Sequence, residues 1–156
     1  MFERLLPDLH EGLIAVGEAA QGLREPWWIF GGAAMALYGL TDLHVPDIDV
    51  LCARRDAPVL LDALGGQVMP DPGEGLFRSA VFGRASDQPL LVEVMAELET
   101  RDGAEWRPAA FTTRHRVVLD DVDLFVPDIR DHIALYRLFG RPKDLARVEQ
   151  LERLIA

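Results

Sequence analysis

Four bulky apolar residues in succession, at positions 27–30, are followed immediately by Gly31 and Gly32. A short apolar run without polar alternation is typical of a strand that is covered on both faces. The two glycines end this strand, and residues 33–38 predict a short helix that closes at Gly39. We therefore expect a sheet with helices packed on it.

The spacing of apolar residues predicts further helices and strands along the rest of the chain. Strands and helices alternate at first and two helices come last, which points to an α+β or α/β sheet with helices packed on it. An acidic Asp120-Asp121 turn joins the last two strands. The expected helices cover residues 2–23, 33–38, 56–64, 128–139 and 142–155, and the expected strands cover 27–30, 47–52, 67–69, 76–82, 90–95, 114–119 and 122–126, with a turn at 70–75.

The length and composition are those of an ordinary globular protein. A chain of 156 residues, 49% hydrophobic and 27% charged, can form a core without disulfide or metal support. No apolar run approaches the roughly 18 residues of a membrane span, and acids among the first apolar residues argue against a secretory signal. Cys52 is the single cysteine and suits a reducing compartment. We expect a soluble, cytoplasmic protein with no membrane partner.

The charge balance is strongly acidic. The formal net charge is -10, from 26 acidic and 16 basic residues. A surface of this sign repels phosphate backbones unless a local basic patch or bound cations compensate. The sequence contains no such basic patch, so we expect no extended nucleic-acid surface.

Three acids stand in expected strands, where a purely structural protein rarely places them. Asp47 and Asp49 are two residues apart, so their side chains project from the same face of a strand. Glu93 interrupts the most hydrophobic strand of the chain. Neighbouring carboxylates stay ionised together only when a positive charge is held between them, and Mg²⁺ prefers such oxygen ligands. If the two strands are neighbours, the three acids could bind two metal ions about 4 Å apart, as enzymes of in-line phosphoryl or nucleotidyl displacement do.

The glycine turn offers a second chemical feature. Glycine lets the backbone approach a ligand closely, and the start of the next helix directs free N–H groups at an anion. Simpler alternatives stay open for these residues. Gly31 and Gly32 could form only a turn between strand and helix, Asp47 could cap the start of its strand, and Glu93 could face water from an edge strand.

Other polar and aromatic residues predict less. The four histidines have no metal-binding spacing, and we expect surface or structural positions for them. Cys52 fits a small core residue. Trp27 and Trp28 fit the core, although one of them could flank a nucleotide base. The histidines are His10, His44, His115 and His132.

These motifs occur together in one known family. The double glycine within residues 30–39, the Asp47-Ile48-Asp49-Val50 run and the later acid Glu93 resemble the DNA-polymerase-beta-like nucleotidyltransferase superfamily. Residues 140–145 contain Arg141, Lys143 and Asp144 in an Arg-x-Lys-Asp order. This order is similar to the branch that contains abortive-infection-type nucleotidyltransferase toxins.

The resemblance implies a fold and a set of roles. The fold would be α+β, a nucleotidyltransferase-type mixed β-sheet packed with helices and a C-terminal helical pair. One domain would span residues 1–156, with a core at about 24–127 and the helices at about 128–155. Asp47, Asp49 and Glu93 would be catalytic and hold two magnesium ions, with Glu93 also able to act as a general base. The nucleotide phosphates would contact Gly31, Gly32, Arg141 and Lys143, and the last two are also candidates for closing the site.

The implied reaction is magnesium-dependent transfer of a nucleoside monophosphate from a nucleoside triphosphate to an acceptor hydroxyl. The acceptor could be a small molecule, an RNA end or a protein, and a homodimer or a small protein partner is possible. The alternative is a catalytically inactive module of the same fold that senses nucleotides or binds a partner, as in a toxin–antitoxin pair.

Three positions depart from the pattern of the toxin-like relatives. Tyr136 or Arg137 stands where a lysine is usual one turn before the Arg-x-Lys-Asp run, and Arg147 stands where a second aspartate is common. Glu93 replaces the more frequent aspartate. These departures concern activity more than fold.

Overall fold

The computed structural model describes residues 5–40, 42–71 and 75–156. Two expectations extend beyond this part of the chain. The first residues of the helix expected at 2–23 and the centre of the turn expected at 70–75 lie outside the described residues.

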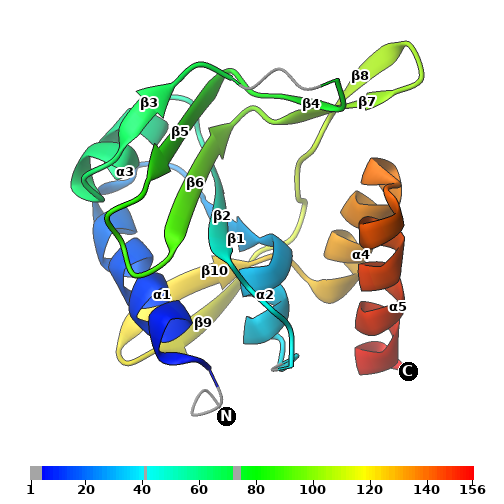
Figure 1. The fold of residues 1–156 in the computed structure, drawn as a ribbon, viewed down its shortest axis with the longest axis horizontal. Coiled ribbons are helices and arrows are strands. Elements are labelled where there is room, and N and C mark those ends of the chain that lie inside the picture. The colour runs from blue at the N-terminus through cyan, green and yellow to red at the C-terminus, as the bar shows by residue number, and fades with distance from the viewer. Residues whose placement is uncertain (1–4, 41, 72–74) are drawn as a thin grey trace.

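A five-stranded mixed sheet forms the centre of the molecule (Figure 1). The strand order is β1-β2-β6-β5-β3. Neighbouring strands are antiparallel except for β2 and β6, which run parallel. The sheet confirms the expected mixed α+β architecture, and its strands are β1 (Trp28–Phe30), β2 (Asp47–Cys52), β3 (Gln67–Met69), β5 (Val81–Ala85) and β6 (Leu91–Ala96).

Alternation along the two central strands separates an apolar face of the sheet from a polar one. Ile48, Val50, Val92 and Val94 are fully buried in the main core cluster. Successive side chains of a strand point to opposite faces, so the residues between them lie on the other face. The helices α1 (Pro7–Ala19) and α3 (Ala57–Ala63) pack on the apolar face, and a 3-10 turn, Ala20–Gly22, extends α1.

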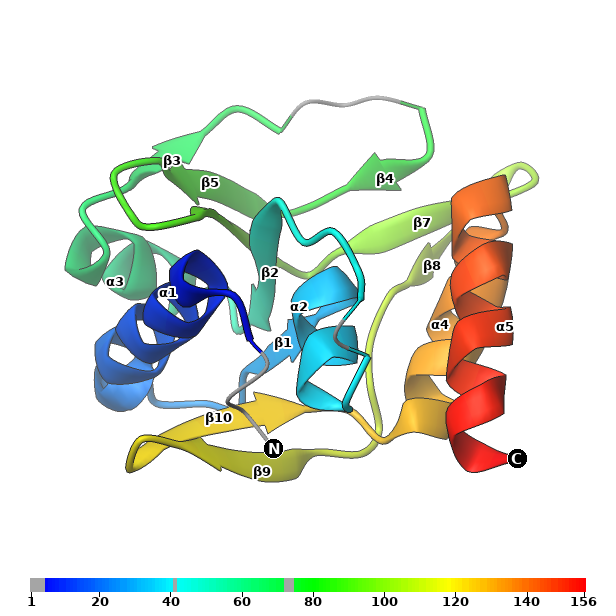
Figure 2. The same ribbon diagram turned by 60° about the horizontal axis from the view of Figure 1, so that its bottom comes forward.

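A second hydrophobic cluster joins the polar side of the sheet to the two last helices. The helix α4 (Ile129–Phe139) begins at Asp128, whose carboxylate accepts the N–H of Arg130 at 2.9 Å. It ends at Gly140, whose φ of 70° suits a glycine. The helix α5 (Pro142–Ile155) follows and packs beside α4 (Figure 2). This cluster contains Phe30, Met35, Leu51, Tyr136, Phe139 and Leu151.

Outside the central sheet, the structure confirms one expected hairpin and corrects another region. The expected hairpin is formed by β9 (His115–Leu119), which begins one residue later than predicted, and β10 (Val122–Val126), with positive φ at Asp120 and Asp121. The strand expected at 76–82 is instead two strands in different sheets, β4 (Phe77–Arg78) and β5. The expectation was wrong because residues 79–80 leave one sheet and enter the next.

A second hairpin was not predicted. The strands β7 (Glu99–Asp102) and β8 (Glu105–Pro108) pair with each other around a turn at Gly103, and β7 also pairs with β4, which gives a three-stranded sheet. Their side chains are mostly exposed and polar, so no apolar alternation marks them. Among the described helices, none has the length and apolar character that a membrane crossing requires.

Gly17→Ala is expected to destabilise the protein by about 1–2 kcal/mol. A Cβ there would collide with Val122 and would lie 3.2 Å from the carbonyl of Asp123. Overpacking of this kind costs about 1–3 kcal/mol, which exceeds the gain of about 1 kcal/mol in helix propensity. Urea denaturation measures the change. Gly22→Ala is the control, because a Cβ there meets nothing within 4 Å, and equal stabilities of the two variants would contradict the packing argument.

Candidate functional site

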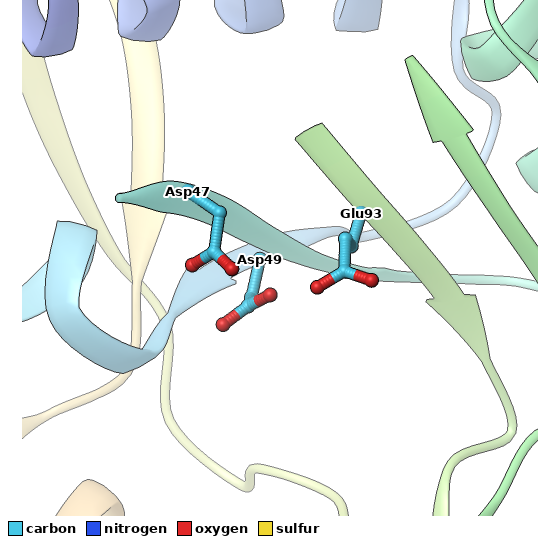
Figure 3. Close-up of side chains that lie close together, drawn as sticks. All are labelled: Asp47, Asp49 and Glu93. Carbon is cyan, nitrogen blue, oxygen red and sulfur yellow. The ribbon is translucent and has the colours of Figure 1, made fainter. Parts of the chain in front are cut away.

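Asp47, Asp49 and Glu93 form one cluster on the polar face of the sheet (Figure 3). Asp49 on β2 pairs in register with Glu93 on β6, and Asp47 precedes Asp49 by two residues on the same face. Each residue offers one carboxylate oxygen, and these atoms lie within 4.8 Å of one another. Because β6 lies between β2 and β5, the alternative that Glu93 occupies an edge strand is wrong.

Glu93 has a cationic neighbour within the sheet. Arg84 on β5 is its register partner, and Arg84 Nε donates to Glu93 Oε2 at 2.9 Å. This ion pair compensates part of the negative charge at one end of the cluster. It leaves Oε1 of Glu93 for a further ligand.

The surroundings of the cluster raise the pKa values of its two aspartates. Burial raises the pKa of Asp49 to about 8, and the charges of Asp47 and Glu93 add to this effect. Burial also raises the pKa of Asp47, with Glu93 as the next cause. Arg147 and Lys143 oppose both shifts without cancelling them. The described cations would therefore compensate a negative charge on either aspartate only in part.

The glycine turn lies directly against this cluster. Gly31 is the first residue of α2 (Gly31–Leu37) and has a φ of 70°. A Cβ on Gly31 would lie 2.9 Å from Oδ2 of Asp49, so this position requires glycine both for its backbone and for space. Gly32 has ordinary clearance, since a Cβ there would lie 3.7 Å from Val45. The N–H of Gly31 donates to Nε2 of His132 at 3.1 Å, so this N–H already has a hydrogen-bond partner within the protein.

Arg141 and Lys143 lie at the start of α5, in two different environments. Arg141 Nε donates to Oδ2 of Asp144 at 2.6 Å, and Arg141 Nη2 donates to Oδ1 at 3.0 Å. Asp144 is completely buried, so the charge of Arg141 is engaged within the protein. Asp144 thus balances the charge of Arg141 at the start of the helix. Lys143 makes no hydrogen bond or ion pair with another described residue.

Arg147 is a site residue that sequence reasoning treated only as a departure. It lies on α5, where a spacing of four residues places it on the same helix face as Lys143. Its Nη1 donates to the hydroxyl of Tyr136 at 3.3 Å, and its guanidinium lies 5.6 Å from the centre of the Tyr136 ring. The i, i+4 spacing of two cations on one helix was the signal that could have identified it.

The three acids, the two glycines and the cations of α5 line one cavity of about 590 Å³. This volume is within the range of about 300–1,000 Å³ that is usual for small-molecule sites. The sheet and the glycine turn contribute the acids and the glycines, and α5 contributes the cations. Trp28 lines a neighbouring cavity and not this one. Its position therefore does not support the alternative that Trp28 flanks a nucleotide base. All seven sequence-predicted residues line the cavity: Gly31, Gly32, Asp47, Asp49, Glu93, Arg141 and Lys143.

Comparisons of sequence found no relatives, whereas comparisons of structure did. No protein-family model matches the chain, and no curated protein matches its sequence. A solved structure from Thermotoga maritima, TM1012, which is described as a proposed nucleotidyltransferase, is 18% identical and has a TM-score of 0.74. The alignment covers 96% of this chain and 92% of TM1012. The chain has the nucleotidyltransferase fold.

Two structures of the antibiotic-resistance factor ANT(2'')-Ia share this fold. Its solution structure is 16% identical and has a TM-score of 0.59, with 91% of this chain and 80% of ANT(2'')-Ia covered. Its crystal structure with adenylyl-2''-tobramycin is also 16% identical, with a TM-score of 0.55 over 88% of this chain and 83% of that chain. At these identities the likeness concerns the fold alone. None of these three structures is described as a toxin, so the toxin-like branch stays a prediction.

Asp49→Asn is expected to stabilise the metal-free protein at pH 7 and above by on the order of 2 kcal/mol. The pKa of Asp49 in the folded state, about 8, lies above its ordinary value of 3.8, so the folded state holds a proton that the unfolded state releases. The wild-type protein therefore loses stability as the pH rises through this interval, and the variant does not. Urea denaturation in EDTA at a series of pH values measures the difference.

Asp62→Asn is the matched control for this experiment. Asp62 is an exposed acid on α3, and its substitution removes the same charge away from the cluster. Its pH dependence should follow that of the wild-type protein. The electrostatic argument is contradicted if Asp49→Asn keeps the wild-type pH dependence.

Proposed function

We propose that this protein is a magnesium-dependent nucleotidyltransferase that moves a nucleoside monophosphate from a nucleoside triphosphate to an acceptor hydroxyl. The observation that carries this proposal is the convergence of three carboxylates, from two adjacent strands, beside Gly31 in one cavity. Cationic side chains from α5 line the same cavity. The nucleotidyltransferase fold of the chain supports the same conclusion.

The acid cluster fits a hard divalent cation. All three candidate ligands are carboxylates, which suit Mg²⁺, and two of them have pKa values raised by burial and by the charges of the neighbouring acids. Asp47, Asp49 and Glu93 would hold the metal, with two ions as the fuller form of the proposal. Bound Mg²⁺ would supply charge stabilisation to the phosphate oxygens during displacement.

The remaining residues of the cavity have separate roles in this proposal. Lys143 and Arg147 bind the triphosphate, because Lys143 is free of other partners among the described residues and Arg147 lies beside it. Arg141 instead keeps the start of α5 in place through Asp144. Glu93 is the candidate general base for the acceptor hydroxyl, and its ion pair with Arg84 holds the Glu93 side chain in position.

A small hydroxylated molecule is the acceptor class that we propose first. The structural neighbour ANT(2'')-Ia was solved with adenylyl-2''-tobramycin, which is a nucleotidyl group joined to a small molecule. A net charge of -10 disfavours an RNA acceptor. The single-domain division, a cytoplasmic location and a homodimer or small protein partner stay predictions.

The Asp47→Asn/Asp49→Asn double variant is expected to lose nucleotidyl transfer by at least about 100-fold. The assay is incubation with labelled ATP, GTP, CTP or UTP, Mg²⁺ and a cell extract, followed by detection of labelled products. Loss is expected because two of the three metal ligands are removed. EDTA should abolish transfer by the wild-type protein in the same way.

Asp62→Asn/Asp87→Asn is the matched control, because it removes the same charge from exposed positions outside the cavity. This control should transfer label at the wild-type rate. The absence of transfer under every condition, with nucleotide binding unchanged in the Asp47→Asn/Asp49→Asn variant, would instead favour the catalytically inactive module.

Lys143→Ala and Arg147→Ala are each expected to raise the KM for the nucleoside triphosphate by about 10- to 100-fold, as loss of a charge-assisted hydrogen bond would.

Arg141→Ala should change KM less and should lower the free energy of unfolding by about 2 kcal/mol, because buried Asp144 loses its partner. Steady-state kinetics and urea denaturation separate the two effects. Arg153→Ala, at the exposed end of α5, is the control. Equal KM changes for all three cavity variants would contradict this division of roles.

A further inference from the structure

His132 is a completely buried histidine that the proposed reaction does not use directly. It lies on α4, and its Nε2 accepts the N–H of Gly31 at 3.1 Å. Its ring stacks on Tyr136 with centroids 4.6 Å apart and contacts Phe111 edge to face. The C-terminal helices are thus joined by a side-chain hydrogen bond to the first backbone group of the glycine turn.

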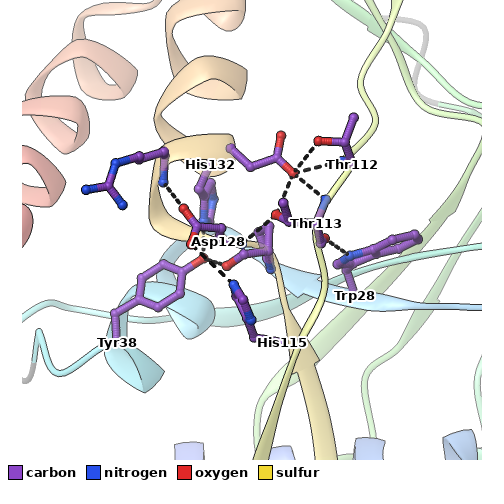
Figure 4. A network of polar contacts seen from close by, with 10 residues as sticks. Trp28, Tyr38, Thr112, Thr113, His115, Asp128 and His132 are labelled. Carbon is purple, nitrogen blue, oxygen red and sulfur yellow. Dashed lines mark hydrogen bonds and ion pairs between the residues drawn. The ribbon is translucent and has the colours of Figure 1, made fainter.

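The hydrogen bonds of His132 with the Gly31 N–H and with Tyr38 define its tautomer, and Figure 4 shows Tyr38 and His132 together. The hydroxyl of Tyr38 donates to the carbonyl of Pro127 at 2.6 Å, which uses its one proton. The 3.1 Å contact between this hydroxyl and Nδ1 of His132 therefore needs the proton on Nδ1. With Nδ1 protonated, the neutral ring has its lone pair on Nε2, where the N–H of Gly31 is received.

The surroundings of His132 keep it neutral. Burial lowers its pKa to about 3, and the charge of Arg147 contributes in the same direction, while Asp131 opposes it. A protonated ring would carry a donor on Nε2 and could not accept from Gly31. The neutral acceptor is therefore the form present throughout the physiological pH range.

The hydrogen bond of His132 reaches the acid cluster through Gly31. A Cβ on Gly31 would lie 2.9 Å from Oδ2 of Asp49, so the α-carbon of this glycine is packed against that carboxylate. Phe30, the preceding residue, also pairs in register with Asp49. The Gly31 peptide, which is hydrogen-bonded to His132, therefore packs against the Asp49 carboxylate.

We propose that His132 is a positioning residue, which holds the Gly31 peptide through Nε2 and so fixes the Asp49 carboxylate in the geometry that binds a divalent cation. This inference rests on the proposed metal site, and it assigns to α4 a role in forming that site. Tyr38 acts one step further away, because it selects the tautomer of His132.

The test measures Mn²⁺ binding by electron paramagnetic resonance, without nucleotide, so that catalysis does not enter. His132→Phe keeps an aromatic ring beside Tyr136 but has no acceptor for Gly31. It is expected to weaken Mn²⁺ binding by about tenfold, as loss of groups that orient metal ligands does. His132→Gln supplies an amide oxygen near the position of Nε2 and is expected to restore most of the affinity.

Tyr38→Phe provides a second and milder variant, which guards against misfolding of His132→Phe. It is expected to weaken Mn²⁺ binding in the wild-type background but not in the His132→Gln background, since glutamine has no ring tautomer to select. A purely structural role of Tyr38 would give equal losses in both backgrounds. The ring ¹⁵N shifts of His132 in the wild-type protein should report a proton on Nδ1 and none on Nε2.

The outcomes separate this inference from the proposed function. If the wild-type protein binds no Mn²⁺, the metal site and the inference are both overturned. If folded His132→Phe binds Mn²⁺ as tightly as the wild-type protein, or if the ring proton is on Nε2, only the inference is overturned. If binding follows the expected order but no nucleotide is transferred, the positioning role holds and the catalytic proposal fails.

Discussion

Holding three carboxylates together on adjacent strands has an electrostatic cost, from burial and from mutual repulsion, and cationic side chains of the neighbouring elements reduce it. The cost arises from register, because the parallel pairing of β2 with β6 places Asp49 beside Glu93. The same pairing buries four valine and isoleucine side chains on the opposite face. A shift by one residue would move those apolar side chains out of the core. Burial of the apolar face thus enforces the proximity of the acids.

The C-terminal helical pair supplies what the sheet lacks. Its helix α5 brings Lys143 and Arg147 to the cavity, and both oppose the raised pKa values of the aspartates. Its helix α4 contributes Tyr136 to the second core cluster and His132 to the glycine turn. The sequence divides into a core and a C-terminal helical pair, but the residues of the candidate site come from both parts. The cavity exists only where the two parts meet.

Sequence reasoning found the acids and glycines because local rules identify them. Alternation with a period of two puts Asp47 and Asp49 on one face, and a charge within an apolar strand marks Glu93. The β7–β8 hairpin was missed because its exposed strands have no apolar period. Arg147 was missed although its i, i+4 spacing from Lys143 on α5 was available. The role of His132 was missed for a different reason, because it depends on packing between α4 and α2, which neither periodicity nor spacing along the chain encodes.

The acids of the cluster are not equivalent, and the difference follows from their neighbours. Glu93 has an arginine partner on β5, whereas Asp49 lies half-buried between two other acids and has no ion pair among the described residues. The raised pKa of Asp49 favours its protonated form near neutral pH, and a cation that binds there must displace that proton. Arg84 already compensates part of the charge at the Glu93 end of the cluster. The sheet thus pre-forms one end of the cluster and leaves the other end to be completed by its ligand.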